Sequence, residues 1–244
     1  MGPVDLDYYL LIGPTIPEVV AAFTKLTGRP LLGPRWTLGY LGSCMTIADQ
    51  PNATELHRGF IQEAQHHRIP CSGFHLSSGY TLDAEGRRCV FTWNKTTYPD
   101  PKAFFQLFQE HNMHVLPNVK PWLLVDHPKY GALREAGGLL RGEDGQVVVE
   151  LFWLGGAGTS GLGSYIDFTS KTGYEWWVAQ VKEQLVAHGA TGIWNDNNEF
   201  ETSDLTAAAG GFGDPLPAGT CRPLLTLAMA RASWEALRGP AGGR

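Results

Sequence analysis

Short apolar segments alternate with amphipathic segments along most of this chain, and this alternation restricts the fold more than any other feature. The apolar segments have the length of buried strands, and the amphipathic segments carry apolar side chains at helical spacing. The predicted strands cover residues 34–42, 72–80, 114–120 and 191–194. The predicted helices cover residues 52–67, 174–188 and 222–237, and a further helix starts at residues 99–101. Strict alternation of strand and helix predicts an α/β fold with a parallel sheet and right-handed crossovers.

Four strand–helix units fit between residues 34 and 238, whereas a complete (β/α)8 barrel needs eight. The sequence therefore predicts a partial (β/α)8 TIM barrel made of about the first four units. Residues 122–168 form a loop-rich insertion with a hairpin at 147–153, and such a long excursion in a compact fold is usually functional. Residues 239–244 form a glycine-rich tail where a fifth strand would begin, so we expect the sequence to be truncated there.

Composition and charge exclude several classes of function. The net charge of −5 provides no basic surface for a nucleic acid. No run approaches the roughly 18 apolar residues of a membrane span, and the N-terminus does not have the pattern of a signal peptide. The four cysteines are scattered, which favours reduced thiols and a cytoplasmic location. The eight histidines show no metal-ligand spacing, so we expect no metal and no cofactor.

One segment, residues 192–199, combines an apolar lead-in with a cluster of carboxylates and carboxamides. Active sites of (β/α)8 barrels are built where the strands end, and this segment has the composition of such an end. Side chains alternate along a strand, so Trp194 and Asp196 are expected to point the same way. An aromatic ring beside a carboxylate suits a sugar-cleaving site. The alternative is that Asp196 only begins a turn and caps the next helix.

Several longer strings in this chain resemble glycoside hydrolase family 31, a family of retaining α-glycosidases. The matching strings are LDYYLLIGPTIPEVVAAFTKLTGRPLLGPRWTLGY at 6–40, FTWN with YPDP at 91–101, DFTSKTGYEWW at 167–177 and GIWNDNNEFE at 192–201. The resemblance implies that residues 34–238 are the N-terminal half of the catalytic barrel. It also implies that residues 1–33, with a strand at 5–12 and a helix at 16–26, are the end of an N-terminal β-domain and a connecting helix.

The resemblance implies a catalytic role for Asp196, the nucleophile that forms a covalent glycosyl-enzyme. The family's acid/base residue lies on a later barrel strand, in the half that this sequence does not contain. Glu199 and Glu201 share a short segment with Asp196, so we expect them to hold the loop by hydrogen bonds rather than to act as the acid.

Substrate-binding residues are expected on other strand ends. Many family members carry an acidic residue at the end of the second strand, where this chain has Ser77 and Ser78, so the usual grip on glucose is in doubt. Lys120 ends the third strand and is expected either to bind a substrate hydroxyl or to pair with Asp196 and hold it ionised. The other candidate substrate-binding residues are Trp153, Trp194, Asn198 and Glu199.

Three functions follow from these observations. The first is hydrolysis of O-glycosyl bonds in α-linked oligosaccharides or glycosides. The second is a truncated, inactive half-barrel or a carbohydrate-binding relic that lacks the acid/base residue; an open barrel edge would then favour self-association. The third is an unrelated barrel hydrolase that uses Asp196 and Glu199 differently. We expect no nucleic-acid and no membrane partner.

Overall fold

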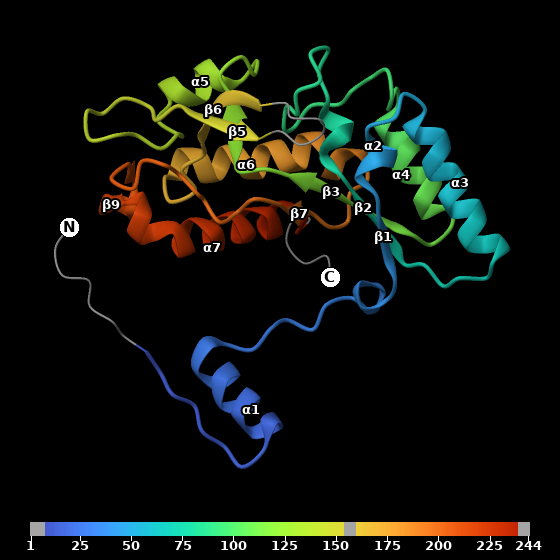
Figure 1. Cartoon of the computed structure of the whole chain (residues 1–244), viewed down its shortest axis with the longest axis horizontal. Coiled ribbons are helices and arrows are strands. Elements are labelled where there is room, and N and C mark those ends of the chain that lie inside the picture. The colour runs from blue at the N-terminus through green and yellow to red at the C-terminus, as the bar shows by residue number, and fades with distance from the viewer. Residues whose placement is uncertain (1–7, 154–159, 239–244) are drawn as a thin grey trace. The chain divides into compact units, whose positions relative to one another are not determined.

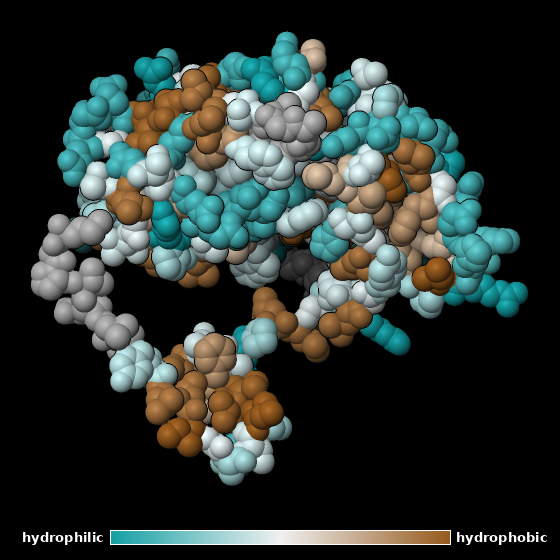
Figure 2. Space-filling model, viewed as in Figure 1, coloured by the Kyte–Doolittle hydropathy of each residue, from teal (hydrophilic) through white to brown (hydrophobic). Residues whose placement is uncertain are grey.

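The computed structural model describes residues 8–153 and 160–238, which divide into two compact units, Met1–Leu38 and Gly39–Arg244. The first unit contains helix α1 (Ile16–Thr27) and a 3-10 turn, η1 (Arg35–Leu38). Helix α1 confirms the helix predicted at 16–26, and Gly28 follows it at φ 96°. Its apolar side chains are largely exposed within this unit (Figure 2).

The strand predicted at residues 5–12 is wrong for residues 8–12, which form no strand, and residues 5–7 lie outside the described residues. Tyr8, Tyr9, Leu10 and Ile12 are each at least 71% exposed, because no strand in the described part of the chain pairs with this segment. The tail at 239–244 also lies outside the described residues.

The second unit is organised around a curled sheet of four parallel strands in the order β1-β2-β3-β7 (Figure 1). The strands are β1 (Leu41–Ser43), β2 (Gly73–Leu76), β3 (His114–Val119) and β7 (Trp194–Asn195). The helices that follow them in turn are α3 (Ala53–His66), α4 (Pro101–Gln109), α6 (Lys171–Gln184) and α7 (Ala218–Leu237). Spatial order follows chain order, which confirms the prediction of the first four units of a (β/α)8 barrel.

Shorter elements complete this unit. They are α2 (Met45–Ala48), η2 (Ser78–Thr81), η3 (Val186–His188), β8 (Ala208–Ala209), η4 (Gly211–Gly213) and β9 (Leu216–Pro217). Helix α7 begins four residues before its predicted start at 222, with Pro223 inside it. Within the described ranges, no helix is both long and apolar enough to span a bilayer.

Local sequence explains where α4 begins and which face it buries. Asp100 accepts a hydrogen bond from the Ala103 backbone N–H at 3.0 Å, which satisfies one of the free donors at the helix start. Pro101 occupies the first turn, where its missing N–H costs nothing. The predicted apolar face is confirmed, since Phe104, Phe105 and Phe108 are all buried.

Pairing of β2 with β3 depends on a glycine. Gly73 lies opposite His114, and a Cβ built on Gly73 would lie 2.3 Å from the His114 carbonyl oxygen. Only the absence of a side chain allows this approach. The register that follows brings the ends of β2 and β3 to one edge of the sheet.

The first strand is shorter than the predicted 34–42. Residues 35–38 form the η1 turn, in which the Thr37 N–H and hydroxyl both donate to the Pro34 carbonyl at 3.0 and 2.7 Å. The predicted hairpin arm at 89–93 is also wrong. That segment contains a turn, in which the Thr92 N–H donates to the Cys89 carbonyl at 3.2 Å, and the Cys89 N–H donates to the Thr81 carbonyl at 3.1 Å.

The insertion at 122–168 has more regular structure than the sequence indicates. It contains β4 (Trp122–Leu124), α5 (Tyr130–Glu135), β5 (Glu150–Trp153) and β6 (Ser160–Tyr165), and its three strands form an antiparallel sheet in the order β4-β6-β5. The hairpin predicted within 147–153 is corrected, because β5 pairs with β6 instead. Gly163 makes room for this sheet, since a Cβ there would lie 2.5 Å from the Leu123 carbonyl oxygen.

Candidate active site

The carboxyl ends of the four parallel strands surround a cavity of about 160 Å³. It is lined by Ser43, Met45, Ser77, Ser78, Asn118, Lys120, Trp153, Trp194 and Asp196. We call it the Asp196 cavity. Six of the residues selected from the sequence therefore meet here, although they come from segments far apart in the chain. Trp194 and Asp196 both line it, as their alternation along the strand predicts.

The Asp196 carboxylate accepts hydrogen bonds from three donors. Its Oδ2 atom accepts from Lys120 Nζ at 2.6 Å and from Asn118 Nδ2 at 2.8 Å. Its Oδ1 atom accepts from the Asn197 backbone N–H at 2.9 Å. The Asp196 N–H in turn donates to the Val119 carbonyl at 2.9 Å, which ties the end of β7 to β3. The carboxylate is thus fixed in orientation from both sides.

The environment of Asp196 favours its ionised form. Burial opposes ionisation, but the hydrogen bonds from Lys120 and Asn118 outweigh it and hold the pKa of the Asp196 carboxyl below its usual value. Burial also lowers the pKa of Lys120, whose side chain is 7% exposed, while its hydrogen bond to Asp196 opposes that shift. Of the two alternatives for Lys120, the pairing with Asp196 is therefore the contact that the structure contains.

The backbone after Asp196 adopts unusual conformations. Asn197 has φ 52° and Phe200 has φ 53°, in the left-handed region that non-glycine residues seldom occupy. Asparagine tolerates this region, whereas a buried phenylalanine does not adopt it without strain. At Asn197 the turn directs the backbone N–H at Asp196 Oδ1. Outliers of this kind cluster at functional sites, where the surrounding structure holds them.

The two tryptophans of the Asp196 cavity differ in their surroundings. Trp194 is partly buried and contacts His75 edge to face, with ring centroids 5.6 Å apart. Trp153 is 56% exposed, at the end of β5. A ring face that is exposed to solvent is available for stacking on a sugar, so Trp153 has the freer surface.

Ser77 and Ser78 both line the Asp196 cavity, and Ser78 contacts a charged side chain. The Ser78 hydroxyl accepts a hydrogen bond from Arg88 Nε at 2.9 Å. Arg88 is itself buried and binds both carboxylate oxygens of Asp49 through Nη2, at 2.8 and 2.9 Å. Gly79 permits this arrangement, because a Cβ there would lie 2.1 Å from Asp49 Oδ1. Of the two serines that stand where the resemblance predicts an acid, Ser78 is therefore supported by the ion pair of Arg88 with Asp49.

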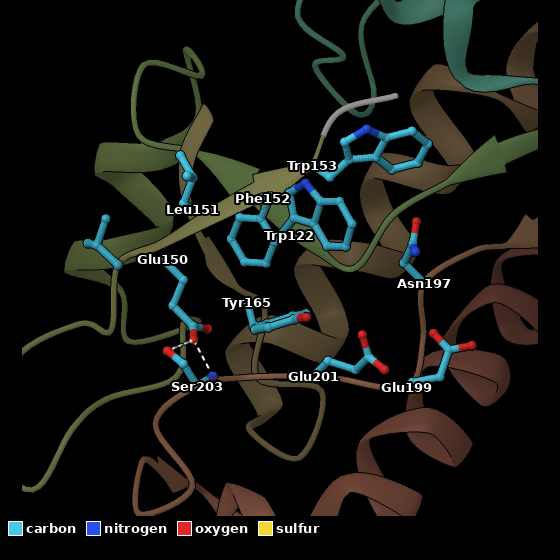
Figure 3. A pocket seen from close by; sticks show the side chains of 11 residues that line it. Trp122, Glu150, Leu151, Phe152, Trp153, Tyr165, Asn197, Glu199, Glu201 and Ser203 are labelled. Carbon is cyan, nitrogen blue, oxygen red and sulfur yellow. Dashed lines mark hydrogen bonds between the residues drawn. The ribbon is translucent and has the colours of Figure 1, made fainter. Parts of the chain in front are cut away.

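A second cavity, of about 540 Å³, lies beside the first and shares Trp153 with it (Figure 3). It is lined by Trp122, Val149, Glu150, Leu151, Phe152, Trp153, Tyr165, Asn197, Glu199, Glu201 and Ser203. We call it the second cavity. Glu199 and Glu201 line it and not the Asp196 cavity, while Asn198 lines neither. Asn198 is held through its backbone carbonyl, which accepts from the Thr226 hydroxyl at 2.5 Å.

Sequence reasoning missed two residues that shape this site. Asn118 lies on β3 and Lys120 comes two positions later, directly after the end of the strand, so the alternation of side chains along a strand would have placed both on one side. Arg88 carries no such signal, because it reaches Ser78 from a turn. Among the described residues, no group of three or more His, Cys, Asp or Glu side chains is arranged to hold a metal ion.

Comparison with known proteins gives consistent matches over this region. The model of the family described as "Glycosyl hydrolases family 31 TIM-barrel domain" matches residues 30–243. Alpha-xylosidase XylQ of Lactiplantibacillus pentosus is 28% identical over 181 residues, which cover 74% of this chain and 22% of that protein. Human neutral alpha-glucosidase AB is 29% identical over 198 residues, which cover 80% of this chain and 20% of that protein.

A solved structure shares the fold. A Flavobacterium johnsoniae family 31 dextranase complexed with glucose superposes with a TM-score of 0.74 at 18% identity, over 92% of this chain and 26% of that one. The chain thus spans about a fifth of the length of the two curated relatives named above.

Proposed function

The chain belongs to glycoside hydrolase family 31, and on that premise we propose that Asp196 is the nucleophile of a retaining α-glycosidase. The observation that carries the proposal is the carboxylate itself. It lines a cavity at the strand ends, and Lys120 and Asn118 favour its ionised form through hydrogen bonds to a single oxygen. An ionised, oriented carboxylate is what attack on an anomeric carbon requires.

The hydrogen bonds suggest which oxygen attacks. Oδ2 accepts two hydrogen bonds, one of them from an ammonium group, whereas Oδ1 accepts one from the Asn197 backbone. We therefore assign the attack to Oδ1. A bond forms between Oδ1 and the anomeric carbon as the bond to the leaving oxygen breaks, and that oxygen takes a proton from an acid. Water then gives a proton to the deprotonated acid and attacks the anomeric carbon, and the bond from that carbon to Oδ1 breaks, which releases the sugar and regenerates the carboxylate.

The acid that protonates the leaving oxygen must be a carboxyl group other than Asp196. In retaining enzymes the two carboxyl groups lie roughly 5–5.5 Å apart across the sugar. Asp196 is the sole carboxylate among the described residues that line its cavity. Glu199 and Glu201 line the second cavity instead. We therefore propose that the acid is supplied by a residue outside the described part of the chain.

The sugar in the Asp196 cavity is proposed to be an α-linked, uncharged glycosyl unit. The relatives named above are an α-xylosidase and an α-glucosidase, which supports this substrate class. Ser77 offers a hydroxyl to the cavity, and the charges of Lys120 and Arg88 are both already paired. Among the described residues that line this cavity, no charge is left unpaired to select a charged sugar.

The experiment that tests Asp196 as the nucleophile must work without the acid that protonates the leaving group. 5-Fluoro-α-D-glucosyl fluoride loses fluoride without protonation, so it esterifies a nucleophile even where the acid is absent. We expect intact-mass spectrometry to show one added fluoroglucosyl group, and peptide mapping to place it on Asp196. Asp196→Ala should abolish labelling. Glu175→Gln, which changes an exposed carboxylate of α6 that lines neither cavity, should leave labelling in place as the control.

Two outcomes would contradict the proposal. Labelling of another residue would refute the assignment of Asp196. Absence of labelling, with the sugar bound reversibly, would favour the second candidate function, carbohydrate binding without hydrolysis. That candidate is favoured by the absence of a second carboxylate among the described residues that line the Asp196 cavity.

A further inference from the structure

The second cavity has a chemical character that differs from that of the Asp196 cavity. Three carboxylates line it, those of Glu150, Glu199 and Glu201, together with the polar side chains of Asn197 and Ser203. None of the described residues in its wall is Lys, Arg or His. An ionised carboxylate only accepts hydrogen bonds. A molecule bound here must therefore donate them, and a negative charge on it would be repelled.

The aromatic residues of the second cavity are held rigidly. Trp122 stacks on Phe152 with ring centroids 4.4 Å apart and an angle of 10° between the planes (Figure 3). Tyr165 meets Phe152 edge to face at 4.9 Å. Lys120 Nζ lies 5.4 Å from the centroid of the Trp122 ring, and its charge is already paired with Asp196. This packing makes the cavity wall a fixed surface rather than a collapsible one.

The acceptors of this wall are also fixed. The Ser203 hydroxyl and backbone N–H both donate to Glu150 Oε1, at 2.6 and 2.5 Å (Figure 3). The other oxygen, Glu150 Oε2, is buried and has no hydrogen-bond partner among the described residues. Glu150 therefore leaves one acceptor without a donor at this wall, which a hydroxyl-rich ligand could supply.

Trp153 connects the two cavities, since it lines both of them. Its side chain is 56% exposed and lies at the end of β5 (Figure 3). The second cavity therefore adjoins the space in which a sugar would bind against Asp196. The volume of about 540 Å³ is ample for one further sugar unit.

We propose that the second cavity binds the leaving group of the substrate and selects uncharged or positively charged, hydroxyl-rich groups against anionic ones. This inference rests on the proposed function, because the term leaving group presumes that Asp196 attacks the neighbouring sugar. It assigns Glu199 and Glu201 to substrate selection rather than to proton transfer. The substrate is then an α-linked disaccharide or longer oligosaccharide with a neutral second unit.

A matched series of probes isolates the charge of the leaving unit. Maltitol and maltobionate share the glucosyl unit and differ only in a terminal CH2OH or carboxylate. 1-Amino-1-deoxymaltitol carries an ammonium at the same position. Calorimetry on the wild-type chain at low salt gives the Kd of each. We expect maltobionate to bind at least about tenfold more weakly than maltitol, and the amine to bind at least as tightly as maltitol.

Variants connect the selectivity to named residues. Glu199→Gln and Glu201→Gln should each reduce the ratio of the maltobionate Kd to the maltitol Kd by about threefold. Glu175→Gln removes an exposed carboxylate of α6 that does not line the second cavity, and it should leave the ratio unchanged. Trp153→Ala should weaken binding of all three probes, because it removes the wall that the two cavities share.

Equal binding of maltitol and maltobionate, or no binding of any probe, would overturn this inference. Unchanged selectivity in both glutamate variants would do the same. The proposed function fails separately, through loss of the covalent label on Asp196. A labelled Asp196 with no charge selectivity would leave the nucleophile assignment standing and remove only the role of the second cavity.

Discussion

A histidine buried in the aromatic core predicts how stability changes with pH. His57 on α3 is fully buried, and its ring contacts Phe74 and Phe104 edge to face, with centroids 4.9 and 5.1 Å away. Nδ1 donates to the Ala53 carbonyl at 2.7 Å, since a carbonyl can only accept. Nε2 has no partner among the described residues, so protonation would place an unsatisfied charge among aromatic rings.

Burial lowers the pKa of His57 from 6.5 to about 4. Above about pH 6.5 the imidazole is neutral in both the folded and the unfolded chain, so it adds no pH dependence there. Between about pH 6.5 and 4 the unfolded chain binds a proton that the folded chain does not, so folding stability falls as pH falls. A difference of about 2.5 pKa units at 1.36 kcal/mol each gives a loss of about 3 kcal/mol.

Urea unfolding followed by tryptophan fluorescence at pH 7 and pH 4 measures this loss. His57→Leu removes the titrating group, so we expect its free energy of unfolding to fall by about 3 kcal/mol less over this interval than that of the wild type. His66→Gln, which changes an exposed histidine near the end of the same helix, should keep the wild-type dependence. If His57→Leu lost as much stability as the wild type between pH 7 and pH 4, the reasoning would be refuted.

The remaining predictions concern the site and two local features. Lys120→Met removes the principal hydrogen bond that lowers the pKa of Asp196, so the acid limb of the pH profile of the labelling rate should move to higher pH. The control Lys129→Met should leave that limb in place. An unmoved acid limb in Lys120→Met would contradict the role assigned to Lys120. Gly73→Ala should lower the free energy of unfolding by about 1–3 kcal/mol, because the new Cβ meets the His114 carbonyl. In Gly59→Ala the new Cβ meets nothing within 4 Å, so this variant should raise the free energy of unfolding by about 0.5–1 kcal/mol. Equal effects of the two substitutions in denaturant unfolding would refute the steric argument. Asp100→Ala should cost about 1 kcal/mol through the lost cap of α4, whereas no change in the unfolding midpoint would show that the cap is dispensable.

Local patterns in the sequence were sufficient for the elements that depend on neighbours in the chain. The Asp100–Pro101 pair and the spacing of three phenylalanines predict α4, because a cap and a helical period act within a few residues. The alternation of side chains places Trp194 and Asp196 on one side of the chain at the end of β7 for the same reason. The strand predicted at 5–12 is wrong over the described residues 8–12, because a strand needs a partner, which periodicity does not supply.

The strand that pairs with β5 also could not be predicted from local sequence patterns. The sequence predicts a hairpin at 147–153, but the pairing strand is β6, drawn from a glycine- and serine-rich run. Glycine has low strand propensity, and here it is required because Gly163 faces the Leu123 carbonyl at close range. The low strand propensity of glycine therefore disfavours β6 in the sequence, although the close contact with β4 requires glycine at this position.

By itself, the sequence determined the alternating α/β pattern, the family and the position of Asp196 at a strand end, because these depend on short-range periodicity and on contiguous strings. Tertiary structure alone decided which groups meet that carboxylate. Lys120 and Asn118 reach Asp196 across 76 and 78 positions of chain, through the register of β3 against β7. It also separated Glu199 from Asp196 into a different cavity. Parallel pairing brings distant strand ends together, and no local pattern specifies that register.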